Sequence, residues 1–161
     1  MVNASYHSAA SEHHNSGMIP EARRHDVEAL LTRAADWAGR QADIRVLLLV
    51  GSWARGNPRL DSDVDLILLT DRVQRYLDGD VLLHALGAER VVRRQNWGAI
   101  EERRLRLASG LEVEVGIGEP SWAATQPVDE GTRRVVMDGV RVLHDPAELA
   151  SRLVSACRPI L

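Results

Sequence analysis

The chain has 161 residues, of which 45% are hydrophobic, so it is long enough for one domain with a single core. Its net charge of −3 argues against bulk nucleic-acid binding, and the absence of Lys excludes a Walker-type phosphate lysine and a Schiff-base lysine. The single cysteine, Cys157, excludes an internal disulfide, and the longest apolar run, Val46 to Val50, is too short to cross a membrane. We therefore expect a soluble, cytoplasmic protein with no membrane partner.

The N-terminal segment differs in composition from the rest of the chain. Residues 1–19 are rich in Ser, His and Asn and lack hydrophobic periodicity, which predicts a disordered tail. Residues 20–161 are predicted to form one domain. From Pro20 to about Gln41, apolar residues recur at helical spacing, and this pattern predicts the first helix.

Two strands are predicted after this helix. Ile44 to Val50 is apolar except for Arg45 and is ended by Gly51, which indicates a strand buried on both faces. Asp63 to Thr70 is predicted to be the second strand. Because side chains alternate along a strand, one face of it carries Asp63, Asp65, Ile67 and Leu69.

The second half of the chain predicts shorter elements. Asp71 can cap a helix that reaches about Leu86 and breaks at Gly79. Two antiparallel strands, joined at Ser109-Gly110, are predicted for Ile100 to Leu107 and Leu111 to Ile117. The remaining predictions are a strand at Arg90 to Arg94, a strand at Val140 to Leu143, and a helix at Ala147 to Ala156 with Asp145 as its candidate cap.

A glycine turn and a pair of carboxylates stand where the first two strands meet their connecting loop. Gly51 and Gly56 permit close approach of the backbone to an anion, and Ser52 adds a hydroxyl donor. Asp63 and Asp65 face the same way and can both reach a pair of metal ions. They could also lie at an exposed strand entrance and only cap it, but the glycine turn before them favours a phosphate-and-metal site.

This segment resembles the motif of small nucleotidyltransferases of the DNA polymerase β superfamily. The matching residues are Gly51-Ser52, Ala54-Arg55-Gly56 and Ser62-Asp63-Val64-Asp65-Leu66. The resemblance implies an α+β fold of two layers, similar to the polymerase β palm, with a mixed sheet of about four or five strands flanked by helices. It also implies that Asp63 and Asp65 hold two Mg²⁺ ions on a nucleoside triphosphate, and that Gly51 and Ser52 bind phosphate.

Such enzymes carry a third carboxylate on a neighbouring strand, which completes the metal site and often activates the attacking hydroxyl. Here both Glu112 and Glu114 lie in apolar-acidic-apolar triplets on one strand face. Glu114 is favoured because it lies nearer the middle of the apolar stretch, with Glu112 as the alternative. Arg55 and Ser62 are candidate nucleotide contacts, although Arg55 can instead support the loop through Asp61 or Asp63, which is the favoured interpretation.

The resemblance implies a transferase that moves a nucleoside monophosphate from ATP or another triphosphate to a hydroxyl, with release of pyrophosphate. The acceptor is an unknown small molecule or protein, because no appended helical domain is present in the sequence to select it. Minimal proteins of this kind also act as antitoxins, so a partner toxin protein that is bound or modified with AMP is the alternative.

Overall fold

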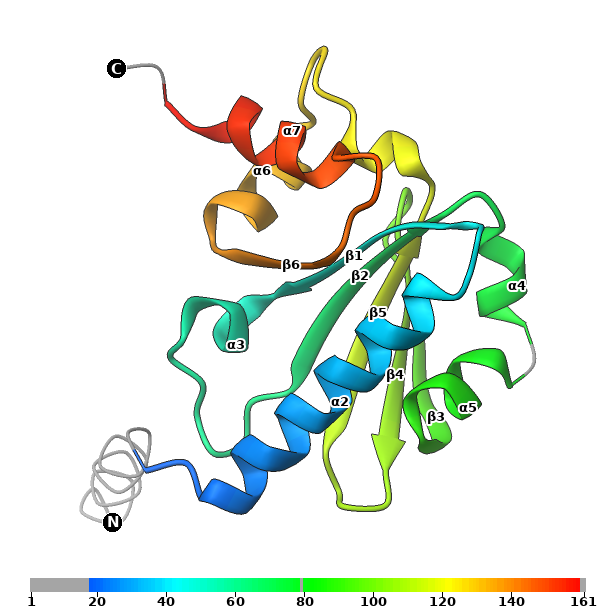
Figure 1. Cartoon of the computed structure of the whole chain (residues 1–161), viewed down its shortest axis with the longest axis vertical. Coiled ribbons are helices and arrows are strands. Elements are labelled where there is room, and N and C mark those ends of the chain that lie inside the picture. Colours follow the sequence, from blue (N-terminus) through cyan, green and yellow to red (C-terminus); the bar gives the residue numbers. More distant parts are fainter. Residues whose placement is uncertain (1–17, 79, 160–161) are drawn as a thin grey trace, which may run out of the picture.

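The structure is a computed structural model that describes residues 18–78 and 80–159. One sheet contains six strands in the order β3-β4-β5-β2-β1-β6 (Figure 1). Strands β2 and β5 are parallel, and all other neighbours in the sheet are antiparallel. The strands are β1 (Ile44–Val50), β2 (Val64–Thr70), β3 (Ala88–Asn96), β4 (Glu101–Leu107), β5 (Glu112–Gly118) and β6 (Val140–His144).

Helices lie against both faces of the sheet. The α-helices are α2 (Glu21–Gly39), α3 (Gly51–Arg55), α4 (Val73–Leu77), α5 (Val81–Leu86), α6 (Glu130–Met137) and α7 (Leu149–Cys157), with a 3-10 turn η1 (Pro120–Ala123). Figure 1 shows α2 crossing the sheet diagonally, whereas α6 and α7 group at the end formed by β1 and β6. The predicted α+β fold with a mixed sheet is confirmed, and the sheet has six strands instead of about four or five.

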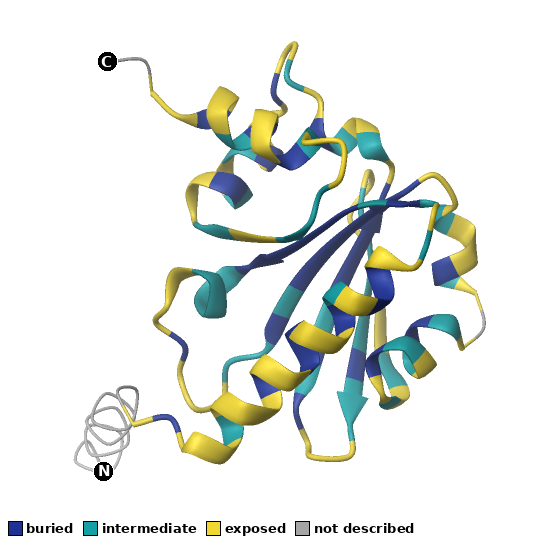
Figure 2. Ribbon diagram, viewed as in Figure 1, coloured by how far each residue is buried: buried dark blue, intermediate teal, exposed yellow. Residues whose placement is uncertain are grey.

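The core is divided by the sheet into two apolar layers. On one face, α2 buries Val27, Leu31 and Trp37 against alternate residues of β2 and β5. The opposite layer packs Ile67 and Leu69 of β2 against α6, α7 and η1. Figure 2 shows β1 and β2 buried along almost their whole length, as the apolar run of β1 predicts.

The second apolar layer covers only part of its face of the sheet. It reaches β6, β1 and the C-terminal half of β2, whereas β4 and β5 carry charged side chains on this face. Period-two alternation places Asp65 on this same face, as predicted, because its neighbours Val64 and Leu66 are buried in the α2 layer. The second apolar layer therefore ends at Asp65.

The structure agrees with some predicted boundaries and corrects others. The segment from Asp71 to Leu86 forms two helices, α4 and α5, on either side of residue 79, where the sequence predicted a break. Asp71 does not cap α4, because its side chain accepts a hydrogen bond from Arg45 at 3.0 Å and Arg72 is the N-cap residue. Helix α6 was not predicted, although Asp129 caps it by accepting from the Thr132 backbone N–H at 3.1 Å.

The remaining predictions concern the two ends of the chain. Asp145 does accept backbone hydrogen bonds from the first turn of α7, which begins at Leu149. Residues 1–17 of the predicted tail lie outside the described residues, and Ile19 is buried. Within the described ranges, every helix is too short or too polar to span a lipid bilayer.

Candidate functional site

The turn between β1 and α3 is built around Gly51. This residue has a φ of +75°, which favours glycine, and a Cβ added to it would overlap the Asp65 carboxylate. Glycine is therefore required here for two independent reasons, the positive φ of the backbone and the space that Asp65 of the neighbouring strand occupies. The absence of a side chain at Gly51 leaves room for the Asp65 carboxylate directly beside the turn.

The loop from Gly56 to Asp63 is fixed by its own hydrogen bonds. The Ser62 hydroxyl accepts from the Arg59 backbone N–H at 2.7 Å, and the Ser62 carbonyl accepts from the Trp53 indole at 3.5 Å. Ser62 thus has a structural role in this conformation, and its predicted contact with nucleotide stays a prediction. Ser52 lies in the first turn of α3, at the end of the buried strand, where the sequence predicted it.

Arg55 supports the loop, but its partners are not the ones expected from sequence. Its guanidinium pairs with Asp138 at the end of α6 and donates to the Asn57 side chain at 3.3 Å. Gly139, with a φ of +124°, gives it space, because a Cβ there would lie 2.9 Å from Arg55 Cγ. Arg55 therefore joins α3 to the α6–β6 connection, and Asp61 and Asp63 are not its partners.

The register of β2 and β5 decides how the acidic residues meet. Asp65 and Glu114 are Cα partners across this parallel pair, and Val64 is the partner of Val113. Glu114 is therefore level with Asp65, whereas Glu112 lies nearer the entrance of the strand. The sequence favoured Glu114 over Glu112 as the third metal ligand because Glu114 lies nearer the middle of the apolar stretch, and this role stays a prediction.

An arginine lies among these carboxylates. Arg104 of β4 donates from Nη1 to Asp63 Oδ2 at 2.8 Å and to Glu112 Oε1 at 3.0 Å, and its Nη2 contacts Glu114 Oε1. Only 20% of its side chain is exposed. Arg104 is therefore held among carboxylates and is not a solvated side chain.

Two further arginines extend this ion-pair network. Arg93 of β3 donates to Glu102 at 2.8 Å and to Glu114 at 3.1 Å. Arg106 donates through Nε to Glu112 at 2.9 Å. The charged part of the sheet face is therefore a network of alternating carboxylates and guanidinium groups across the three strands β3, β4 and β5.

The environment shifts the pKa of two carboxyl groups in opposite directions. Burial, together with the charges of Asp63 and Glu102, raises the pKa of Asp65 to about 6, against the opposing effect of Arg104 and Arg55. Hydrogen bonds from Arg106 and Arg104 lower the pKa of Glu112. Asp65 thus lies where additional positive charge would be most favourable.

The predicted metal ligands fit Mg²⁺ by chemistry but are not arranged around one point. Within residues 18–78 and 80–159, no three His, Cys, Asp or Glu side chains are grouped closely enough to hold a metal ion. Carboxylate oxygens are nevertheless the ligands that Mg²⁺ prefers, and Asp63, Asp65 and Glu114 lie on one sheet face at the end of the Gly51 turn. Asp63 and Glu114 both pair with Arg104, so gathering the three carboxylates around one ion would require Arg104 to move.

A pocket of about 400 Å³ opens beside Asp65 and Glu114. Its floor is formed by β2 and β5, and its walls come from the β3–β4 hairpin tip on one side and from η1 and α6 on the other. Ile100 of the hairpin tip packs over Gly116 and Gly118, where a Cβ would approach it to 2.9 and 2.7 Å. The pocket is lined by apolar residues together with Asp65, Glu102, Glu114, Trp97 and Trp122.

Glu102 is a pocket residue that sequence reasoning missed. Its carboxylate accepts from the Trp97 indole at 3.3 Å as well as from Arg93. The available signal was the alternation along the predicted strand, which puts Glu102, Arg104 and Arg106 on one face. The observed register, centred on Ser109, pairs Arg106 with Glu112 and Arg104 with Glu114. This alternation identifies the face of β4 that turns toward the carboxylates.

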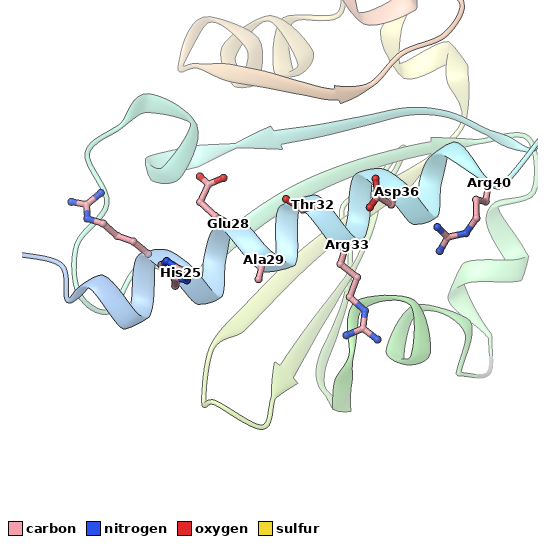
Figure 3. A pocket seen from close by; sticks show the side chains of 8 residues that line it. His25, Glu28, Ala29, Thr32, Arg33, Asp36 and Arg40 are labelled. Carbon is pink, nitrogen blue, oxygen red and sulfur yellow. The ribbon is translucent and has the colours of Figure 1, made fainter.

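A larger hollow, of about 840 Å³, lies elsewhere, along the outer side of α2 (Figure 3). Figure 3 shows that its labelled residues, among them His25, Glu28 and Arg33, come from this helix and its C-cap and project in different directions. Because α2 covers the opposite face of the sheet, this hollow has no part in the acidic site.

Searches against protein-family models and against curated proteins found no match. Among solved structures, the Cid1 poly(U) polymerase matches with a TM-score of 0.47 and 20% identity over 62% of this chain and 31% of that chain. The same enzyme with Mg and 3′-dATP bound gives a TM-score of 0.45 and 20% identity over 62% and 32%. An aminoglycoside 6-adenyltransferase from Bacillus subtilis gives 0.43 and 13% over 58% and 35%.

The chain spans about a third of the length of the solved chains that it matches. Any assignment of activity to this chain therefore rests on its own residues.

Proposed function

We propose that this chain is a metal-dependent nucleotidyltransferase that transfers a nucleoside monophosphate from ATP or another triphosphate to a hydroxyl. The observation that carries the proposal is the meeting of Asp65 with Glu114 across parallel strands, directly beside the Gly51 turn. The motif from Gly51 to Leu66 supports the same assignment. Together they supply the residue types that a triphosphate with its metal ions requires.

Asp63, Asp65 and Glu114 are the proposed metal ligands, with Glu112 as the alternative third carboxylate. When bound, Mg²⁺ neutralises triphosphate charge and lowers the pKa of an attacking hydroxyl. The raised pKa of Asp65, caused first by burial and then by nearby carboxylates, supports a site that favours added positive charge.

The protein's own groups divide the remaining work. The backbone of Gly51 and Ser52 is proposed to contact phosphate oxygens, because this turn lies beside Asp65 and has no side chain at Gly51. The acceptor oxygen attacks the α-phosphorus, the bond to pyrophosphate breaks, and Glu114 accepts the hydroxyl proton. Glu114 suits this role because it lines the pocket on the side of the hairpin tip.

The pocket beside Glu114 is the proposed acceptor site. Trp97 and Trp122 offer aromatic surfaces on its walls, and Glu102 offers an acceptor for hydrogen bonds. Trp97 is 62% exposed, so its ring is available to a ligand. We propose that the acceptor hydroxyl reaches Glu114 through this pocket.

The test uses ATP labelled at the α-phosphate, Mg²⁺ and a cell lysate as the source of acceptors. The wild-type chain should transfer label and release pyrophosphate, and Asp63→Ala and Asp65→Ala should each lower transfer by at least about 100-fold because they remove proposed metal ligands. Asp61→Ala is the matched control, since Asp61 is exposed in the same loop. Unchanged transfer in both site variants would refute the proposal.

The same experiment separates the two kinds of acceptor. Label on a small molecule supports an enzyme that modifies small molecules, whereas label on a protein supports the alternative of a partner toxin. Calorimetry with Mg²⁺ and ATP adds a measurement that does not depend on the acceptor. If the wild-type chain does not bind Mg²⁺ and ATP, both catalytic alternatives, modification of a small molecule and modification of a toxin protein, are excluded.

A further inference from the structure

Arg104 has a position that the proposed function does not explain. It reaches Asp63, Glu112 and Glu114 at once, and these three carboxylates come from the loop before β2 and from β5. Its two neighbours in the network are more peripheral, since 47% of the Arg93 side chain and 44% of the Arg106 side chain are exposed, against 20% for Arg104. Arg104 is the central cation of the cluster.

The guanidinium of Arg104 is held mainly by its charge, through ion pairs with carboxylates, and its capacity to donate hydrogen bonds is not fully used. Both terminal nitrogens of the guanidinium are directed at carboxylates, while the Nε is buried without a hydrogen-bond partner. Leaving a buried donor unpaired is costly, so the ion pairs must outweigh this cost. The side chain is thus held in place by the negative charge that surrounds it.

A divalent cation at the proposed site would bind carboxylate groups that Arg104 already contacts. Glu114 Oε1 and Asp63 Oδ2 both accept from Arg104, and both residues are proposed metal ligands. A guanidinium and a metal ion held by the same carboxylates repel each other, so each weakens the binding of the other.

Resting on the proposed function, we propose that Arg104 is a resident counter-cation that competes with the divalent metal for Asp63 and Glu114. In the metal-free protein, it neutralises the carboxylates and keeps the sheet face assembled. Metal binding displaces its guanidinium, so the metal affinity of the free protein is set by Arg104. Arg104 is in this sense a positioning residue that acts through the carboxylates.

The test measures Mn²⁺ binding to the nucleotide-free chain from the electron paramagnetic resonance signal of free Mn²⁺. Arg104→Gln should bind Mn²⁺ at least about tenfold more tightly than wild type, because a competing positive charge is removed. Arg106→Gln is the matched control, since it removes a guanidinium of the same strand that pairs with Glu112 alone. Its affinity should stay within about twofold of wild type.

Arg104→Lys guards against a variant that fails to fold. Lys keeps the charge but presents one point charge in place of the planar fork, so its Mn²⁺ affinity should lie between those of wild type and Arg104→Gln. In wild type, the proton on Arg104 Nε, followed through the ¹⁵N resonance, should exchange slowly with solvent in EDTA. It should exchange faster when Mg²⁺ is added. An unchanged resonance at saturating Mg²⁺ would overturn the proposal.

The remaining outcomes separate this proposal from the proposed function. Equal or weaker Mn²⁺ binding by Arg104→Gln, in a protein that still transfers nucleotide through Asp63 and Asp65, overturns the role of Arg104 alone. Tighter Mn²⁺ binding in a protein that transfers no nucleotide supports the role of Arg104 and overturns the proposed function alone.

Discussion

At the scale of single residues, Gly51 links the fold to the proposed chemistry. Its positive φ is a backbone demand, and the Asp65 carboxylate beside it is a demand of the site. Gly56 has nearly the same φ, +77°, but open space where a Cβ would be. The two glycines therefore separate the cost of backbone conformation from the cost of displacing Asp65.

We expect Gly51→Ala to lower the free energy of unfolding by about 2–4 kcal/mol and Gly56→Ala by about 1 kcal/mol, as measured by urea denaturation. Binding of Mg²⁺ and ATP, measured by calorimetry, should be lost in Gly51→Ala and retained in Gly56→Ala. Equal effects of the two substitutions on stability and on binding would show that Asp65 does not depend on the space at Gly51.

At the scale of elements, the β3–β4 hairpin tip forms a wall of the pocket because β5 carries glycines beneath it. A Cβ at Gly118 would lie 2.7 Å from Ile100 Cδ1 and 3.0 Å from the Ala99 carbonyl oxygen. The side chain of Ile100 can move, but the backbone oxygen of Ala99 cannot yield without shifting the tip. The pocket thus depends on a close approach between two elements.

Gly118→Ala should lower the free energy of unfolding by about 1–3 kcal/mol, because it overfills this contact. Gly39→Ala, at a position with open space, should have little effect or raise stability slightly. In a double-mutant cycle, Ile100→Ala should recover part of the loss caused by Gly118→Ala. Strict additivity of the two substitutions in urea denaturation would contradict the proposed contact.

Elements with strong periodicity could be predicted from sequence, whereas their register could not. The apolar run from Ile44 and the alternation after Asp63 identified β1, β2 and the face that carries Asp65. The pairing of β2 with β5 connects segments distant in sequence, and no local turn encodes it. The sequence therefore favoured Glu114 over Glu112 without the register, and the structure adds that Glu114 is level with Asp65.

The site departed from expectation where charge was interpreted residue by residue. An arginine on a strand is usually solvated, whereas Arg104 lies among carboxylates and was not considered as part of the site. Helix α3 was missed because its residues were interpreted only as a glycine turn, although its five residues do begin at Gly51. In each case the interacting residue lies on a strand distant in sequence: Glu114 of β5 for Arg104, and Asp65 of β2 for Gly51 of α3.

At the scale of the whole molecule, the proposed site and a stabilising hydrogen-bond cluster around Asp43 lie at different ends of the sheet. The carboxylates of the site lie where the second apolar layer ends, whereas Asp43 joins segments at the opposite ends of β1 and β2. Its carboxylate accepts from Thr70 at 2.9 Å, from Arg75 at 3.1 Å and from the Tyr76 hydroxyl. This acid thus ties the α2–β1 turn to the end of β2 and to α4.

Asp43 predicts how the stability of the molecule depends on pH. Burial alone would raise its pKa, but hydrogen bonds from Tyr76 and Thr70 and the charge of Arg75 outweigh burial and lower the pKa below its ordinary value. A lowered pKa in the folded state means that this stabilisation is complete above the unfolded pKa of about 3.9 and is lost as the pH falls through the folded pKa. The contribution of Asp43 should therefore be present at neutral pH and absent in acid.

Asp43→Asn should consequently lower the free energy of unfolding by about 1–3 kcal/mol at neutral pH, since it weakens charge-assisted hydrogen bonds to three partners. The difference from wild type should shrink as the pH falls below about 4, because protonation removes the same charge from the wild-type residue. Urea denaturation across this pH range measures it, with Asp36→Asn on the exposed side of α2 as the matched control. A difference that stays constant down to about pH 3 would assign the effect to shape and packing and would exclude ionisation of Asp43 as its cause.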